Sequence, residues 1–172
     1  MREYILLLPI LFIIHDMEEI IGFERFYKKN GDLFEKFPKI TMRFKGVKAD
    51  AFALAVYEEF IPFFGVSLLA YYFPNKILYA LWFGIFLSLT GHFIVHIGHT
   101  VYLRKYIPSF ATSLICLPIS VSILLRCAKV MTFDVLTIVT IIISILLMIA
   151  NLRFAHAVAH FVNKQVTEQG IA

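Results

Sequence analysis

The sequence has 172 residues, 60% of them hydrophobic, with a mean hydropathy of +0.81 and a formal net charge of +4. Ordinary soluble domains are only about half apolar, so this composition excludes a typical soluble protein and predicts one integral membrane domain over residues 1–172. The positive charge does not indicate a nucleic-acid partner, because basic loops beside membrane helices have the same composition.

Apolar segments long enough to cross a bilayer recur along the chain. We expect helices at about residues 4–26, 50–73, 77–103, 109–127 and 133–163. The first segment resembles the apolar part of a signal peptide, but it runs directly into His-Asp-Met-Glu-Glu without a small-residue cleavage site, so we interpret it as a retained helix. Pro74, Pro108 and Thr132 mark short connections, which favour antiparallel neighbours. The predicted fold class is an all-α transmembrane bundle of about five spans.

Basic residues gather in and beside the first loop, at about residues 27–49. They are Arg25, Lys28, Lys29, Lys36, Lys39, Arg43, Lys45 and Lys48. Because lysine and arginine accumulate on the cytoplasmic side, we expect this loop and the C-terminus inside a cell membrane and the N-terminus outside. Phenylalanines and tyrosines interleave with the bases, which suits contact with an anionic leaflet; the alternative is a solvated loop that only fixes orientation.

Ionisable side chains inside the predicted spans are the main functional signal, because they are costly to insert and are retained where they face an interior, a partner or an ion. They include all six histidines and are His15, Glu18, Glu19, Glu58, Glu59, His92, His96, His99, His156 and His160. At 1.5 Å per residue they fall in the cytoplasmic half of four helices. The fourth predicted helix carries none, so we expect it to serve as scaffolding.

Helical geometry places several of these residues on common faces. His92, His96 and His99 form one narrow stripe on the third predicted helix. Three glycines spaced by seven run beside that stripe and would let a neighbouring helix approach closely: Gly84, Gly91 and Gly98.

On the first predicted helix, Glu18 and Glu19 follow His15 by three and four residues, and both spacings return to the same side. Histidines and carboxylates projecting inward from several helices are typical of di-metal sites in bundle cores. Glu58 and Glu59 are about 100° apart on their helix, so we expect only one of them to reach the site.

The motif His15-Asp16-Met17-Glu18-Glu19 at the end of a first apolar helix resembles the HXXEE family, which is named for that motif. The carboxylates in the second helix, the spaced histidines in the third and the segment Tyr106-Ile107-Pro108 also resemble the family layout. In the family layout we expect a glycine after this proline, whereas this chain has Ser109 there. The resemblance implies an integral membrane protein of uncharacterised activity.

Together these residues predict a divalent-metal site, with zinc or iron as the ion and a dinuclear centre as one possibility. The candidate ligands are His15, Glu18, Glu19, Glu58, His92, His96, His99, His156 and His160, with His15, Glu18, His92 and His96 at the centre; Glu19 and Glu58 are the candidate catalytic bases. We expect a metal-dependent hydrolase or oxidoreductase that acts on a hydrophobic or lipid-like substrate.

Other functions are compatible with the same residues. The chain could transport protons or divalent cations, ligate a heme, or use a structural metal or a buried polar network without catalysis. No Gly-x-Ser-x-Gly motif indicates a serine hydrolase. Cys116 and Cys127 are eleven residues apart on one helix, so we expect no disulfide between them.

Overall fold

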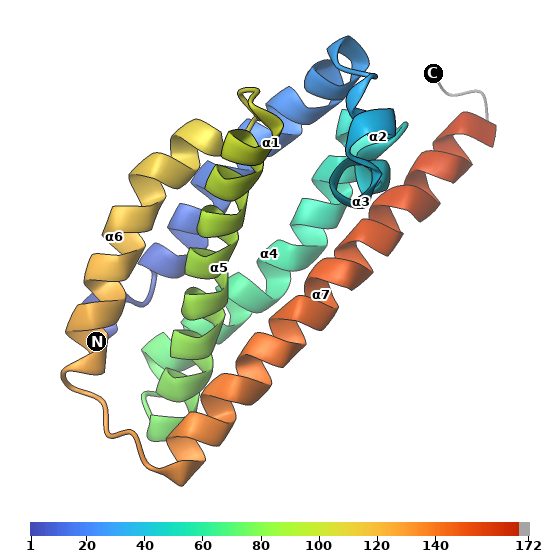
Figure 1. Cartoon of the computed structure of the whole chain (residues 1–172). Helices are drawn as coiled ribbons and strands as arrows, with labels where there is room; N and C mark the ends of the chain where they lie inside the picture. The colour runs from blue at the N-terminus through green and yellow to red at the C-terminus, as the bar shows by residue number, and fades with distance from the viewer. Residues whose placement is uncertain (169–172) are drawn as a thin grey trace.

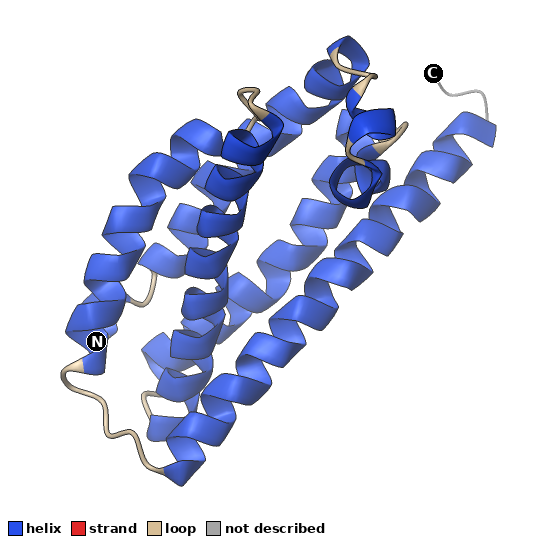
Figure 2. Ribbon diagram, in the orientation of Figure 1, coloured by secondary structure: helices blue, strands red, loops and turns tan. Residues whose placement is uncertain are grey.

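The computed structural model describes residues 1–168, and the predicted domain's last four residues lie outside that part. The elements are η1 (Arg2–Tyr4), α1 (Leu7–Lys29), α2 (Leu33–Lys36), α3 (Pro38–Thr41), η2 (Met42–Phe44), α4 (Ala49–Tyr72), α5 (Lys76–Leu103), α6 (Phe110–Ala128) and α7 (Val135–Glu168). Residues 1–168 contain no strand, so the predicted all-α class is confirmed (Figure 2).

Four helices are long and apolar enough to cross a membrane, namely α4, α5, α6 and residues Val135–Gln165 of α7. The 23-residue α1 lies beside them but carries the charged His-Asp-Met-Glu-Glu motif in its middle, which lowers its hydropathy. The prediction of about five spans corresponds to these four helices together with α1.

The long helices run in alternating directions through the bundle (Figure 1). The first loop, the α5–α6 turn and the end of α7 lie at one end, which we call the loop end; the chain start and the α4–α5 turn lie at the other. Helix α5 packs against α6 and α7, while α1 packs against α4. Side chains of α1 and α5 nevertheless meet inside the bundle.

Helices α5 and α7 touch closely far from the loop end and separate towards it (Figure 1). A Cβ atom added at Gly84 would lie 2.6 Å from the Ser144 Cβ and 2.8 Å from the Ile141 carbonyl oxygen. A Cβ at Gly91 or Gly98 would meet nothing within 4 Å. Of the three glycines expected to admit a neighbour, only Gly84 has that role, and open space lies beside the other two.

Large aromatic side chains fix α1 against α4 and α5. Trp82 and Phe86 are fully buried, and the Trp82 indole Nε1 donates a 3.0 Å hydrogen bond to the Ile5 carbonyl oxygen. The rings of Phe12 and Phe63 stack with centroids 4.3 Å apart. Burying such a side chain stabilises a fold by roughly 1.5–3 kcal/mol in water, and the same packing here sets the register of α1.

The aromatic residues of the first loop pack on one another. Tyr27 stacks on Phe34 and on Phe44, with centroids 5.3 Å and 5.2 Å apart, and Phe23 meets Phe44 edge-on at 4.8 Å. These rings close the loop end above α1 and α4. Contact of this loop with an anionic leaflet stays a prediction.

Candidate metal centre

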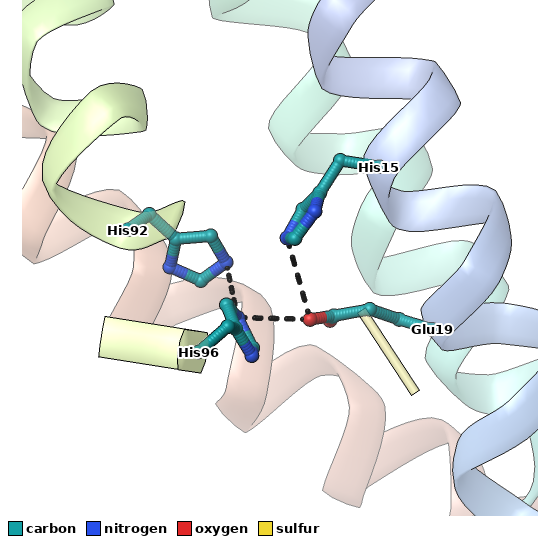
Figure 3. A group of neighbouring side chains, drawn as sticks. All are labelled: His15, Glu19, His92 and His96. Atoms are coloured by element: carbon teal, nitrogen blue, oxygen red, sulfur yellow. Dashed lines mark hydrogen bonds and ion pairs between the residues drawn. The ribbon is translucent and has the colours of Figure 1, made fainter. Parts of the chain in front are cut away.

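Two residues of α1 and two of α5 meet inside the bundle near the loop end (Figure 3). His15 and Glu19 are four residues apart, as are His92 and His96, so each pair lies on one helix face. One ligand-type atom from each residue lies within 4.8 Å of the others. His15, Glu19 and His96 are buried, and His92 is half-buried.

Within this four-residue cluster the Glu19 carboxylate lies close to two of the imidazoles, and the third imidazole contacts His96 (Figure 3). Its Oε1 atom is 2.9 Å from His96 Nε2 and 3.6 Å from His15 Nε2, while His92 Nε2 is 2.8 Å from His96 Nε2. Within the described residues, neither His15 Nε2 nor Glu19 Oε1 makes a well-formed hydrogen bond. Buried polar atoms without well-formed hydrogen bonds are costly, and a group bound between these side chains would reduce that cost.

The cluster geometry fits a four-coordinate metal ion. Bonds of about 2.0–2.2 Å to nitrogen and oxygen place neighbouring ligand atoms of a tetrahedral zinc site roughly 3.3 Å apart. Three of the separations, 2.8, 2.9 and 3.6 Å, bracket that value, and all four ligand atoms lie within 4.8 Å of one another. Three imidazoles and one carboxylate therefore form a donor set that a divalent ion would satisfy.

A second layer of polar groups orients His15. The Thr112 hydroxyl donates a 2.7 Å hydrogen bond to Glu18 Oε2, which also accepts from the Thr112 backbone N–H at 2.9 Å. Because the hydroxyl proton is directed to Glu18, Thr112 Oγ1 is free to accept from His15 Nδ1, which lies 3.1 Å away. That tautomer leaves the lone pair of His15 Nε2 facing the cluster.

His96 and Glu18 have further partners in the turn between α5 and α6. Ser109 Oγ lies 2.7 Å from His96 Nδ1, and the Tyr106 hydroxyl donates to Glu18 Oε1 at 2.5 Å. The hydrogen bond to Glu18 raises the pKa of the Tyr106 phenol above its ordinary value.

Ser109 has a φ of +91°, which explains why a glycine is expected at this position. A non-glycine residue in this region costs about 1–2 kcal/mol, and the bond from Ser109 to His96 offsets part of that cost. The start of α6, expected to serve as scaffolding alone, thus supplies Thr112 to the site. Gly22 of α1 packs against Pro108 so closely that a Cβ would lie 2.5 Å from the proline side chain, which fixes the turn against the motif.

The structure separates the predicted carboxylates. Glu18 lies outside the four-residue cluster and binds Thr112 and Tyr106 instead. Glu59 lines a cavity beside the cluster, whereas Glu58 does not.

Sequence reasoning missed Asp16, which is buried, lines the same cavity and has no partner for Oδ2 among the described residues. The sequence did offer a signal for Asp16, because a carboxylate in the middle of an apolar helix is costly unless it has a role.

The remaining predicted histidines lie towards the loop end. His99 lines the cavity with its ring centroid 6.2 Å from that of His96. His156 also lines the cavity, and its Nδ1 is 2.7 Å from the Leu152 carbonyl oxygen. His160 is exposed on α7. None of the three belongs to the four-residue cluster.

The cavity has a volume of about 580 Å³ and lies between α1, α4, α5 and α7, with Arg43 and Phe44 of the first loop in its wall. Most of its lining residues are apolar. Leu87, Ile94 and Ile149 line it and are also exposed on the surface of α5 and α7. The cavity therefore opens between these two helices, on a face that is apolar.

Comparison with known proteins agrees with the motif. No curated protein and no solved structure matches the chain. A family model described as "Protein of unknown function with HXXEE motif" matches residues 6–123, more than two thirds of the chain. This range contains the four-residue cluster together with Glu18, Ser109 and Thr112. The chain belongs to the HXXEE family of proteins of unknown function.

Proposed function

We propose that this protein is an intramembrane metalloenzyme in which His15, Glu19, His92 and His96 hold a divalent ion, zinc or iron, and that it acts on a hydrophobic, lipid-like substrate. The main supporting observation is the buried four-residue cluster, in which Glu19 Oε1 lies close to His15 and His96 while His92 contacts His96. Zinc and iron both accept nitrogen and carboxylate ligands, and the set offers no soft sulfur donor for copper(I).

The second layer supports a metal centre over a purely structural network. In proteins, a metal-binding histidine ordinarily donates its other ring nitrogen's proton to a neighbouring oxygen. His15 and His96 each have a hydroxyl oxygen at Nδ1, from Thr112 and Ser109. Both rings thereby direct Nε2 towards Glu19 Oε1, so that one ion could bind all three atoms.

The cavity supports a substrate drawn from the bilayer. It borders His92 and His96 directly and opens through apolar residues of α5 and α7. Ligand sites are typically apolar pockets of about 300–1,000 Å³ with a few polar groups, and this cavity falls within that range. In our proposal the loop end faces the cytoplasm, following the basic first loop.

Two carboxylates outside the cluster are placed for proton transfer. Glu59 on α4 and Asp16 on α1 line the cavity next to the histidines. A bound divalent ion would supply Lewis-acid activation. Glu59 would take up or return a proton at a substrate atom in the cavity, and Asp16 would hold the polar side of the cavity beside His15. The predicted base Glu58 does not face this space.

A transporter is the less favoured alternative because conduction needs polar groups on both sides of the membrane. Among the described residues, the buried charged and histidine side chains are His15, Asp16, Glu19 and His96; the last three line the cavity, and His15 lies beside Glu19. The far half of the bundle is packed with Trp82, Phe86 and other apolar side chains.

The test is turnover of membrane lipids. Metal-loaded protein in liposomes made from a total bacterial lipid extract should deplete one lipid class and produce another, as followed by mass spectrometry. The His92→Ala, His96→Ala variant should leave the extract unchanged. Metal-dependent uptake of a divalent cation into sealed liposomes, with no lipid converted, would contradict the enzyme proposal and favour transport.

A further inference from the structure

The cavity has a polar end and an apolar end. Its polar end, beyond the four-residue cluster towards the loop end, is lined by Arg43, His99 and His156. Its opposite end is lined by side chains such as Phe12, Phe63, Leu87 and Ile145. From His99 to Leu87 the cavity follows α5 for about 18 Å at 1.5 Å per residue.

Arg43 gives the polar end a positive charge. Its Cζ atom lies 5.1 Å from the ring centroid of Phe44, and that ring lies 5.8 Å from the ring of His156. Among the side chains that the structure describes, the ion pairs of lysines account for the basic partners, and none of the described carboxylates forms an ion pair with this guanidinium. An arginine fork without a carboxylate suits phosphate or carboxylate oxygens.

His156 provides a second recognition element. Its Nδ1 lies 2.7 Å from the Leu152 carbonyl oxygen and therefore donates there, which leaves Nε2 as an acceptor. That Nε2 atom is buried and has no hydrogen-bond partner within the described residues. It is positioned to accept a hydrogen bond from a hydroxyl group of a ligand in the cavity.

The first loop is anchored so that Arg43 stays over the cavity. The Asn163 side chain of α7 donates to the Gly46 carbonyl oxygen at 2.8 Å and accepts from the Lys48 backbone N–H at 3.1 Å. The Ala49 backbone N–H donates to Glu24 Oε2 at 2.8 Å. These bonds tie the segment after Arg43 to α1 and α7, which is the preorganisation that a binding site needs.

The volume suits one aliphatic chain inside the cavity. If each heavy atom occupies roughly 30 Å³, the share of one water molecule in the liquid, 580 Å³ holds about 19 heavy atoms. One aliphatic chain with a small headgroup fits that space, whereas the two chains of an ordinary phospholipid exceed it.

We infer that the cavity binds a single-chain amphiphile with an oxyanion headgroup, a phosphate or a carboxylate, held by Arg43 at the loop end with its chain in the apolar end. As an assignment of substrate class, this inference rests on the proposed function. The headgroup lies beyond the four-residue cluster, so the first carbons of the chain pass beside His92 and His96. The chain enters sideways between α5 and α7, where the apolar rim is exposed.

The experiment measures displacement of a fluorescent long-chain alcohol from metal-loaded, full-length protein in zwitterionic nanodiscs. Dodecyl phosphate and dodecanoate should displace it at lower concentration than dodecanol or dodecyltrimethylammonium. Arg43→Gln should weaken both anions about tenfold or more, as expected for loss of a charge-assisted hydrogen bond, and leave dodecanol unchanged. Arg43→Lys should retain part of the preference. Arg25 is exposed, as Arg43 is, but it does not line the cavity, so Arg25→Gln should behave as the parent protein.

Three results would overturn the inference: equal binding of dodecanol and the anions, no effect of Arg43→Gln, or no displacement by any chain. Chelator-treated protein separates the two proposals. If anion binding is lost on chelation but survives Arg43→Gln, the headgroup lies on the metal, so the proposed function stands and this inference fails. If the protein holds no metal but binds anions through Arg43, the inference about the ligand stands and the proposed function fails.

Discussion

Thr112 is the residue through which the account of the metal centre can be tested without touching a ligand. Thr112→Val keeps the shape of the side chain and removes the hydroxyl that accepts from His15 Nδ1 and donates to Glu18. The buried His15 N–H then loses its acceptor, at a cost of about 1–3 kcal/mol. Loss of such an orienting bond typically lowers metal affinity by about 10- to 100-fold, equivalent to about 1.4–2.8 kcal/mol.

The assay is a zinc titration of metal-free protein against a chelator of known affinity, at one pH and in one detergent. The matched control is Thr100→Val on α5, because the Thr100 hydroxyl has no hydrogen-bond partner in the described structure. Thr112→Val should bind zinc at least about tenfold more weakly, while Thr100→Val should match the parent protein. Equal zinc affinity for both variants would refute the orienting role of Thr112.

Three further predictions follow from the same geometry. Glu19→Gln should abolish stoichiometric metal binding, whereas Glu58→Gln, outside the cavity lining, should retain it; equal metal contents from elemental analysis would contradict this. Gly91→Leu should project into the cavity and suppress lipid turnover with metal content intact, whereas Gly98→Leu, which has space but does not line the cavity, should not; the comparison uses the liposome assay. The ion pair with Lys76, together with hydrogen bonds from the Thr137 backbone N–H and hydroxyl, lowers the pKa of Asp134 to about 2 from 3.8, so these contacts stabilise the fold above about pH 4. Asp134→Asn should lower the Tm at neutral pH, and the difference should vanish as the pH falls towards 2; a constant difference would exclude the ion pair as its cause.

Hydropathy and helical periodicity predict much of this fold and part of the site. The apolar windows indicate the long helices because a bilayer span needs about 20 apolar residues, and the observed helices include α4 at Ala49–Tyr72 and α5 at Lys76–Leu103. The three- and four-residue spacings also predict that Glu18 and Glu19 lie on the side of His15, and that His92 and His96 share a face. Of the two carboxylates, the prediction placed Glu18 at the centre of the site, whereas the structure has Glu19 there.

The spacing of residues along one helix does not predict which neighbouring helix each of its faces will contact. Glu18 and Glu19 differ by about 100°, and only the packed bundle shows that Glu19 faces α5 while Glu18 faces Thr112 of α6. Glu58 and Glu59 also differ by about 100°, and only Glu59 lines the cavity.

Other features of the site depend on tertiary packing. Ser109 and Thr112 were not predicted as site residues, because hydroxyls in membrane helices commonly bond to their own backbone. Gly84 and Gly91 belong to the same seven-residue repeat of glycines, yet α7 packs against Gly84 and leaves open space beside Gly91. The cavity exists because α5 and α7 diverge, and no local pattern predicts that angle.

Metal content is the most direct test of the central claim that His15, Glu19, His92 and His96 form a metal centre. Elemental analysis of protein purified in detergent without added metal, beside the His92→Ala, His96→Ala double variant, gives the answer. We predict one equivalent of zinc or iron per chain in the parent protein and almost none in the variant, with both proteins equally helical by circular dichroism. A folded parent protein that holds no stoichiometric metal, and gains none on incubation with zinc or iron(II), would contradict the account.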